Sequence, residues 1–174
     1  MPAVETERLR LRGWSEADLD PCADMLADPD TARFIGGACG RDDAWRRMAA
    51  FIGHWHLRGY GMWALEEKAS GRFLGWCGLW NPEGWPEPEV GWSLVPSAQG
   101  RGYATEAARR ARDYAYRTLG WSTLISLIDL ENHASRRVAE RLGARLDGMH
   151  LLRGSEAGIF RHPGPSDISQ PRTH

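Results

Sequence analysis

Two glycines that flank one arginine lead directly into an alanine- and arginine-rich run, in the stretch VPSAQGRGYATEAARRARDY of residues 95–114. The alanines of that run recur at helical spacing, which predicts a helix that ends near Gly120. The first amides of a helix lack intrahelical partners, and the helix dipole adds partial positive charge there. Because glycine lets an anion approach the backbone, Gly100 and Gly102 indicate a phosphate-binding loop, to which Arg101 can add a cation.

The two common nucleotide-binding glycine motifs do not fit this loop. A Walker A loop places lysine and then Ser or Thr after its last glycine, whereas Tyr103 and Ala104 follow Gly102 here. A Rossmann fingerprint has a third glycine where Thr105 stands, and it usually follows an early strand rather than a segment past the middle of the chain. A tight strand-to-helix turn that binds no ligand remains the alternative to a phosphate site.

Composition argues against several classes of function. The 174 residues suit one domain, and the formal net charge of -1 gives no basic surplus for nucleic acid or anionic membranes. No apolar run approaches membrane-spanning length, and the charged N-terminus lacks an apolar signal segment, so a cytoplasmic location is predicted. The cysteines Cys22, Cys39 and Cys77 are odd in number and lack a CxxC pair, which favours free thiols over disulfides or a metal site.

The first half of the chain predicts a strand, two helices and a hairpin. The segment ERLRLRGW alternates as a strand does, and Ser15 is the expected N-cap of the helix after it. A second helix is expected over DDAWRRMAAFIGHWHLR, with its stop at Gly59, and YGMWALEE and RFLGWCGLWN form the hairpin. The expected apolar positions of the second helix are Trp45, Met48, Ala49, Ile52 and Trp55.

The second half alternates strands and helices around the glycine loop. The strand VGWSLVP precedes the loop, and STLISLIDL follows the loop's helix as a strand covered on both faces. The segment NHASRRVAERLG predicts a helix capped by Asn132 and ended by Gly143. Two more strands complete a single domain over residues 1–162, and the proline-rich tail of residues 163–174 is expected to be unstructured.

The segment from Gln99 to Ala104 resembles the Q/R-x-x-G-x-G/A pyrophosphate loop of the GNAT acetyltransferases. EVGWSLVPSAQGRGYATEA followed by NHASRRVAERLGA resembles the ribosomal-protein N-acetyltransferase (RimJ/RimL-like) branch, and the resemblance extends from ETERLRLR to about residue 162. The chain departs from the pattern at Ala144, where the family usually has an aromatic residue. It departs again at Ala139, where many members carry a tyrosine acid.

The resemblance implies an α/β (α+β) fold, in which a mixed, mostly antiparallel sheet is flanked by helices and splays between the strands VGWSLV and STLISLIDL. It implies acetyl-CoA as co-substrate in that splay, without a metal, and its pantetheine beside the strand backbone. It implies a direct attack by a primary amine, and it is compatible with a homodimer. The cofactor-binding residues that it implies are Leu94, Val95, Gln99, Gly100, Arg101, Gly102, Tyr103, Ala104, Asn132 and Ser135.

Two residues are the candidates for catalysis. Ser135 is expected one turn into its helix beside the sulfur, where it can protonate the leaving thiolate, although a surface position is the alternative. Glu89 opens the strand that should meet the acetyl group and is a candidate base. Asn132 can act as a helix cap, as a cofactor ligand or as both. The pair His54 and His56 lacks the further ligands of a metal site.

The acceptor is expected to be a protein N-terminal α-amine or a small-molecule amine. An α-amine has a pKa of roughly 7.7–8.0, against about 10.4 for lysine, so it needs less help from a base. Glu83 and Glu87 are expected to be solvated rather than catalytic. A non-catalytic CoA-binding regulatory module and a nucleotide-binding protein remain the alternative functions.

Overall fold

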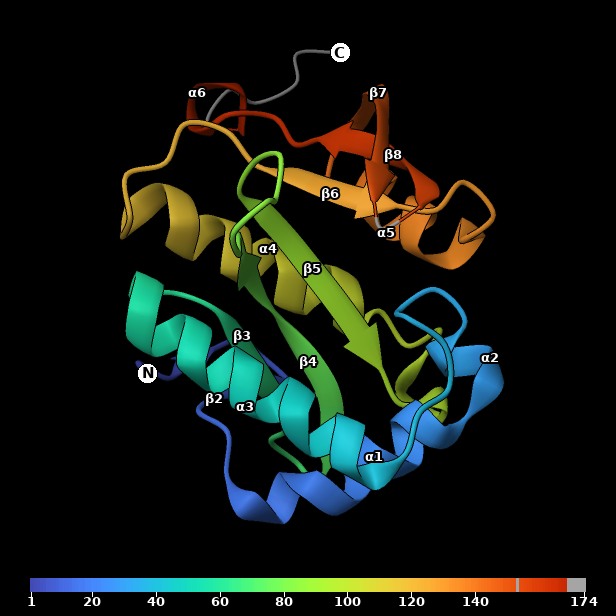
Figure 1. The fold of residues 1–174 in the computed structure, drawn as a ribbon. Coiled ribbons are helices and arrows are strands. Elements are labelled where there is room, and N and C mark those ends of the chain that lie inside the picture. Colours follow the sequence, from blue (N-terminus) through green and yellow to red (C-terminus); the bar gives the residue numbers. More distant parts are fainter. Residues whose placement is uncertain (153, 169–174) are drawn as a thin grey trace.

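The computed structural model describes residues 1–152 and 154–168, which form one eight-stranded sheet with helices on both faces (Figure 1). The strands lie in the order β1-β2-β3-β4-β5-β6-β8-β7. All neighbouring strands are antiparallel except β5 and β6, which are parallel. The predicted mixed, mostly antiparallel sheet is therefore confirmed. The strands are β1 (Val4–Glu5), β2 (Leu9–Arg12), β3 (Met62–Glu67), β4 (Phe73–Trp80), β5 (Glu89–Leu94), β6 (Ile125–Ile128), β7 (Arg145–Leu152) and β8 (Ser155–Arg161).

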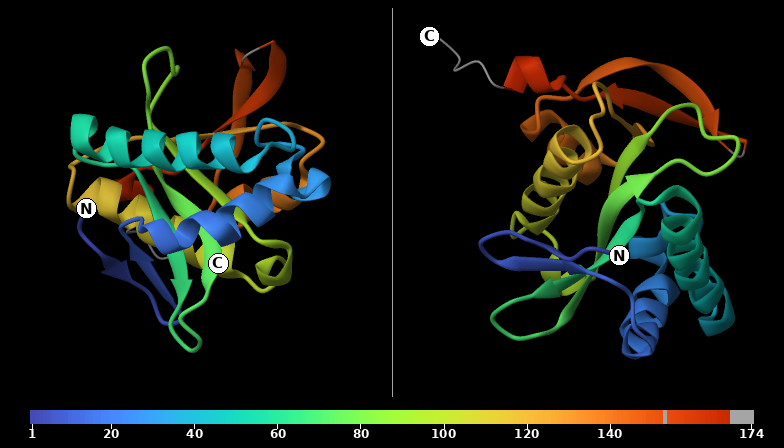
Figure 2. Two further views of the ribbon diagram at one scale, coloured as in Figure 1. Left: turned by 60° about the horizontal axis from the view of Figure 1, so that its bottom comes forward. Right: turned by 90° about the vertical axis from the view of Figure 1, so that its left-hand side faces the viewer.

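The helices cover the two faces of the sheet in two groups. Figure 2 shows α1 and α3 on one face, with α4 and α5 on the other. Two short 3-10 turns, Glu16–Asp18 and Pro96–Ala98, precede α1 and the glycine loop. The α-helices are α1 (Leu19–Ala27), α2 (Pro29–Ala32), α3 (Arg41–Arg58), α4 (Tyr103–Arg117), α5 (His133–Arg141) and α6 (Pro165–Ile168).

The predicted helix boundaries are set by local capping. The Asn132 side chain accepts a hydrogen bond from the Ser135 N–H at 3.1 Å, so Asn132 is the N-cap of α5. Gly59 ends α3 with a φ of 77°, and its N–H donates to the Trp55 carbonyl at 3.0 Å. Ser15 caps the 3-10 turn before α1 in a capping box with Asp18. These ends agree with the predictions made from the sequence.

The alanines of α4 pack directly on the sheet. Ala107, Ala108, Ala111 and Ala115 are fully buried in the larger core cluster, together with residues of β2 to β5. Because alanine is small, the helix axis approaches the sheet closely and the start of α4 is held against the end of β5. This packing fixes the position of the glycine loop.

The buried face of α3 differs from the predicted one. Trp45 and Ile52 were expected in the core, but they are 58% and 41% exposed. The buried side includes Phe51, whose ring lies 5.5 Å from both Trp14 and Trp76. This aromatic cluster on the sheet turns the helix so that Phe51 faces inward, which a periodicity count over α3 alone does not register.

The tail also differs from the prediction over part of its length. Residues Pro165–Ile168 form a short helix, where an unstructured segment was expected. The Tyr116 hydroxyl donates to the Pro163 carbonyl at 2.9 Å and holds the chain against α4. Residues 169–174, for which the same expectation was made, lie outside the described residues.

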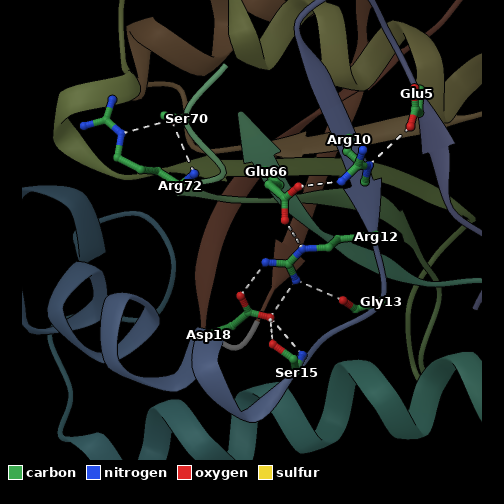
Figure 3. Close-up of polar contacts among 9 residues, drawn as sticks. All are labelled: Glu5, Arg10, Arg12, Gly13, Ser15, Asp18, Glu66, Ser70 and Arg72. Carbon is green, nitrogen blue, oxygen red and sulfur yellow. Dashed lines mark hydrogen bonds and ion pairs between the residues drawn. The ribbon is translucent and has the colours of Figure 1, made fainter. Parts of the chain in front are cut away.

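A charge network joins the first strands to the turn before α1 (Figure 3). The Arg12 guanidinium donates to both Asp18 oxygens at 2.8 Å and to Glu66 at 2.7 Å. Arg10 reaches the same Glu66 at 2.9 Å and Glu5 at 3.2 Å. These ion pairs connect β2, β3 and the turn that leads into α1, and the carboxylate of Asp18 is buried at their centre.

None of the helices in residues 1–152 and 154–168 combines the length and apolar character that a membrane crossing needs. The three cysteines are free, as predicted.

Candidate active site

The parallel strands β5 and β6 pair at one end and then separate. Within the described residues their ladder consists of Glu89 opposite Ile125, supported by the Ile125 N–H donating to the Pro88 carbonyl at 3.1 Å. On its other side, β5 pairs with β4 along its whole length. The edge of β5 that faces β6 is therefore open beyond its first residue, which is the predicted splay (Figure 1).

The open edge of β5 presents different backbone groups from those expected. The backbone near Leu94 and Val95 was expected to offer hydrogen bonds to the pantetheine, but the Val95 N–H donates to the Leu74 carbonyl of β4 at 3.0 Å. Since successive residues of a strand point their backbone groups to opposite sides, Trp92 and Leu94 face the splay instead. The Leu94 carbonyl accepts from the Gln99 side chain at 3.1 Å, which leaves the Leu94 N–H toward the opening. The backbone groups of Leu94 and of Trp92, which the sequence reasoning did not name, are therefore those on the side of the splay.

The glycine loop has the conformation that an anion site needs. Gly100 and Gly102 have φ values of 73° and 81°, in the left-handed region that favours glycine. Gly102 is the N-cap of α4, so the N–H groups of Tyr103, Ala104 and Thr105 have no intrahelical acceptor. The loop from Gln99 to Gly102 is exposed, and Ala104 and Thr105 after it are half-buried.

The side chain of Tyr103 is an anchor for this loop. Its hydroxyl donates to Glu67 of β3 at 2.5 Å, and its ring is only 3% exposed. The guanidinium carbons of Arg8 and Arg101 lie 4.4 and 5.0 Å from the ring centroid. Arg101 also lies 3.8 Å from Glu67. In this structure the predicted phosphate cation is directed at Glu67 and Tyr103, and Tyr103 has only its backbone amide free for a ligand.

A shallow pocket of about 400 Å³ adjoins the loop on the side of α5. Gly102 belongs to both the loop and the pocket lining. The Thr105 hydroxyl is buried in this lining and has no hydrogen-bond partner among the described residues. The sequence reasoning had noted Thr105 only as the residue in place of a third glycine. The lining residues are Glu7, Arg8, Gly102, Thr105, Glu106, Arg109 and Arg141.

Glu89 lies at the point where β5 and β6 separate. Its Oε1 accepts from the Leu127 N–H at 3.1 Å, and its Oε2 accepts from the Trp85 indole at 2.7 Å. Burial raises the pKa of Glu89 to about 7, and these two hydrogen bonds only partly offset the effect. A carboxyl with a pKa near neutrality can accept a proton at physiological pH, as a general base must.

A second link joins the two strands beside Glu89. The Ser126 hydroxyl donates to the Val90 carbonyl at 2.6 Å and lies 3.0 Å from His162 Nε2. Burial lowers the pKa of His162 to about 3, so its imidazole is neutral. Side chains therefore replace the missing backbone ladder next to the splay, a feature that no sequence motif signalled.

The neighbouring carboxylates differ in their surroundings. Glu83 is exposed, as expected, with Arg58 3.7 Å away. Glu87 was also expected to be solvated, but Arg161 donates to both of its oxygens at 2.8 Å. This bidentate pair keeps the pKa of Glu87 below its usual range, which leaves Glu89 as the carboxyl of this loop and strand that is suited to accept a proton.

Asn132 and Ser135 lie at the start of α5. The side-chain oxygen Oδ1 of Asn132 accepts a hydrogen bond from the backbone N–H of Ser135, and this bond caps the helix. The Ser135 side chain is half-buried, and its hydroxyl has no hydrogen bond within the described residues. Ala139, at the position of the missing tyrosine, is fully buried in a small core cluster of α5 and β8.

The two histidines of α3 have separate roles. His54 is buried and stacked on Trp80 at 4.4 Å, with Nδ1 2.8 Å from the Tyr60 carbonyl and Nε2 accepting from the Asn81 N–H at 3.2 Å. Both ring nitrogens are occupied, and burial lowers the pKa of His54. His56 is exposed. Within the described residues, no three His, Cys, Asp or Glu side chains gather as metal ligands would.

Comparison with known proteins gives one consistent family. The chain is 34% identical over 146 residues to the uncharacterized protein YkkB of Bacillus subtilis (strain 168), a match that covers 79% of this chain and 82% of that protein. A crystal structure of an acetyltransferase from Agrobacterium tumefaciens superposes with a TM-score of 0.86 at 34% identity, over 93% of this chain and 94% of that one. At 17% identity the ribosomal L7/L12 N-acetyltransferase RimL, solved in complex with coenzyme A, shares the fold alone, with a TM-score of 0.76 over 93% of this chain and 98% of that one.

The family model of the acetyltransferase (GNAT) domain matches residues 8–145, which span the predicted splay, the glycine loop and the helix that carries Ser135. That match includes both the open edge of β5 and the exposed amides at the start of α4. The sheet of eight strands flanked by helices is likewise the fold of the solved acetyltransferase from Agrobacterium tumefaciens. The chain therefore belongs to the GNAT acetyltransferase family and is a transferase enzyme.

Proposed function

We propose that this protein transfers an acetyl group from acetyl-CoA to a primary amine, which is a protein N-terminal α-amine or a small-molecule amine. The observation that carries the proposal is Glu89, a buried carboxyl with a pKa of about 7 at the point where β5 and β6 separate. The family accounts for acetyl transfer, and Glu89 supplies a proton acceptor matched to an amine near neutral pH.

The residues present fit a coenzyme A ligand. The amides of residues 103–105 would hold its pyrophosphate at the start of α4, because they lack acceptors and the helix dipole favours an anion there. Trp92 and Leu94 would offer backbone groups to the pantetheine arm along the open edge of β5. When bound, acetyl-CoA supplies an activated acyl group as a thioester.

Two side chains of the protein then transfer protons, one as an acceptor and one as a donor. As the amine nitrogen bonds to the acetyl carbon, Glu89 takes a proton from that nitrogen, directly or through water. As the carbon–sulfur bond breaks, the Ser135 hydroxyl would donate a proton to the departing sulfur and regain one from water, while Glu89 would return its proton to water. The attack is direct, so no acetyl group is attached to the protein at any stage.

The finer assignment is to the RimJ/RimL-like branch in a cytoplasmic setting. The matching motifs around the glycine loop and Asn132 support the branch, as does the fold shared with RimL, which acts on a ribosomal protein. The three free cysteines suit a reducing compartment.

An acceptor screen with acetyl-CoA tests this function. Release of the CoA thiol would be followed with N-terminal peptides, polyamines, amino acids and aminoglycosides, and Glu89→Gln would serve as the matched control. We expect amine-dependent thiol release that the variant strongly reduces. Coenzyme A binding without turnover on any amine would instead favour a regulatory CoA-binding module, and ATP that displaces CoA would favour a nucleotide-binding protein.

A further inference from the structure

The pocket beside the glycine loop is built from three parts of the chain that are distant in sequence. Glu7 and Arg8 come from the segment before β2, and Arg141 comes from the last turn of α5. The remaining lining residues come from the first two turns of α4. The pocket therefore adjoins the proposed phosphate loop at Gly102 and lies between the segment before β2 and the end of α5.

The charge of this pocket is positive once its ion pairs are counted. Arg8 neutralises the Glu106 carboxylate, with its Nη2 2.6 Å and its Nε 2.7 Å from Glu106 Oε2. Glu106 Oε1 also accepts a hydrogen bond from the Thr6 hydroxyl at 2.6 Å. Arg109 and Arg141 are exposed, and neither has an ion-pair or hydrogen-bond partner among the described residues. Two free guanidinium groups thus face a single free carboxylate, that of Glu7.

A hydrogen-bonding group in the lining also lacks an acceptor. The Thr105 hydroxyl is buried, without a partner in the described part of the chain, between Gly102 and Arg109 on the same side of α4. Residues that are four positions apart on a helix lie one above the other, so Thr105 and Arg109 face the pocket together. An anion in the pocket would provide the acceptor that the protein does not.

We propose that this pocket binds the 3′-phosphate of coenzyme A, so that the protein distinguishes coenzyme A from its 3′-dephospho form. The proposal rests on the proposed function, because it assumes that the pyrophosphate occupies the glycine loop. Coenzyme A carries its second anionic centre on the ribose next to the pyrophosphate, and the pocket shares Gly102 with the loop. Guanidinium groups match phosphate geometry, and Arg109 and Arg141 come from two helices and can approach one phosphate from two sides.

Isothermal titration calorimetry with two ligands and five proteins tests the proposal. Coenzyme A and 3′-dephospho-coenzyme A would be titrated into wild type, Arg109→Ala, Arg141→Ala and the double variant. Arg117→Ala is the matched control, because Arg117 is an exposed arginine on the same helix at the end opposite to the loop. We expect wild type and the control to prefer coenzyme A by about tenfold, as charge-assisted contacts to phosphate provide. The preference should fall to less than about twofold in the double variant.

The outcomes separate this proposal from the proposed function. Equal affinity of the two ligands in wild type, or an unchanged preference in the double variant, would overturn the 3′-phosphate site while coenzyme A binding stands. If neither coenzyme A nor its 3′-dephospho form bound wild type, the cofactor assignment itself would be overturned. Circular dichroism melting of each of the four variants checks that the three substitutions, all at exposed positions, leave the fold intact.

Discussion

At the scale of single residues, the environment of Glu89 decides its chemistry. The residue type alone would give an acid that is ionised near pH 7 and is therefore a weak base. Burial at the end of the β5–β6 ladder raises its pKa to about 7, although two donors contact its oxygens. Sequence position suggested Glu89 as a base, but only the packing around it separates it from the ion-paired Glu87.

Glu89→Gln should lower kcat/KM most at pH values where the substrate amine is still protonated. The defect should shrink at high pH, because the amine then loses its proton without help. The measurement is a pH profile of kcat/KM for both proteins with the best amine from the screen. Parallel profiles for the two proteins would remove Glu89 from the proton transfer.

The same substitution should change the pH dependence of stability. A carboxyl with a raised folded-state pKa costs stability as pH rises from its unfolded pKa, near 4.5, to its folded pKa of about 7. Glutamine does not ionise, so the Tm of Glu89→Gln relative to wild type should improve between pH 5 and pH 8. This comparison is independent of any constant loss from altered hydrogen bonds.

Ser135→Ala should lower kcat by roughly 10²–10⁴-fold, the range of general acid–base catalysis. The α5 cap uses the Ser135 N–H rather than its hydroxyl, so helix stability and coenzyme A affinity should change little. Steady-state kinetics and calorimetry on the same preparation check both points. An unaltered kcat, with chemistry shown to be rate-limiting, would leave the hydroxyl without a catalytic role.

At the scale of elements, the junction of β5, the glycine loop and α4 determines the cofactor site. Gly102→Val should weaken coenzyme A binding, because a β-branched residue at a φ of 81° is strained and its side chain would meet Arg8. Gly120→Val is the control: Gly120 has a similar φ of 72° at the other end of α4. The control should lose stability but bind coenzyme A normally, as calorimetry and thermal melting would show. Equal affinities in the two variants would contradict the loop assignment.

Tyr103→Phe tests the anchor between the loop and β3. The Tyr103 hydroxyl is one of the donors, with Ser70 and Arg72, that hold the pKa of Glu67 at about 2. Without it, Arg101 loses part of its fixed surroundings and the loop becomes less ordered. We expect a higher KM for acetyl-CoA with a nearly unchanged kcat, measured by initial rates. A fall in kcat alone would instead place Tyr103 in the chemistry.

The elements themselves were largely predictable, because helix caps and turns are local. Asn132 and Gly59 end or begin helices through contacts within a few residues, and the sequence contains those contacts. The side of α3 that is buried was not predictable in the same way. It depends on Phe51 meeting Trp14 and Trp76, which come from other elements. The engagement of Val95 with β4 likewise depends on strand register.

At the scale of the whole molecule, buried acids set the limit of stability at low pH. Burial alone would raise the pKa of Asp18, but hydrogen bonds from Arg12 and Ser15 outweigh it and lower the pKa. A lowered folded-state pKa stabilises the fold above the unfolded pKa, and that stability is lost as pH falls through the folded pKa. Glu67 and Glu106 shift in the same direction.

The Tm of wild type should therefore fall steeply below about pH 4. Asp18→Asn should be less stable at neutral pH, because Arg12 then keeps Glu66 but loses its buried carboxylate partner. Its Tm should decline less below pH 4, where the wild-type carboxyl also loses its charge. Thermal melts at several pH values test both statements, and parallel curves would assign the acid sensitivity to other carboxyls.

The sequence predicted only those parts of the candidate site that carry a recognisable motif. The glycine loop was found because positive-φ glycines before a helix leave a sequence signature. The pocket beyond it was not found, because Arg8, Arg109 and Arg141 are brought together by the packing of α4, α5 and the segment before β2. Ser126 and His162, which link β6 to its neighbours, were missed for the same reason.

Within the described residues β5 and β6 share a single backbone rung, so side chains of Ser126 and Glu89 provide much of the contact between the two strands. The Glu89 carboxylate of β5 accepts a hydrogen bond from the Leu127 N–H of β6. If Glu89 takes the proton from the amine, each turnover changes the charge of a group that also links the two strands. Proton uptake would then weaken the hydrogen bond from Leu127, because a neutral carboxyl oxygen is a poorer acceptor than a carboxylate oxygen. The same carboxyl would thus serve both in proton transfer and in the contact between β5 and β6.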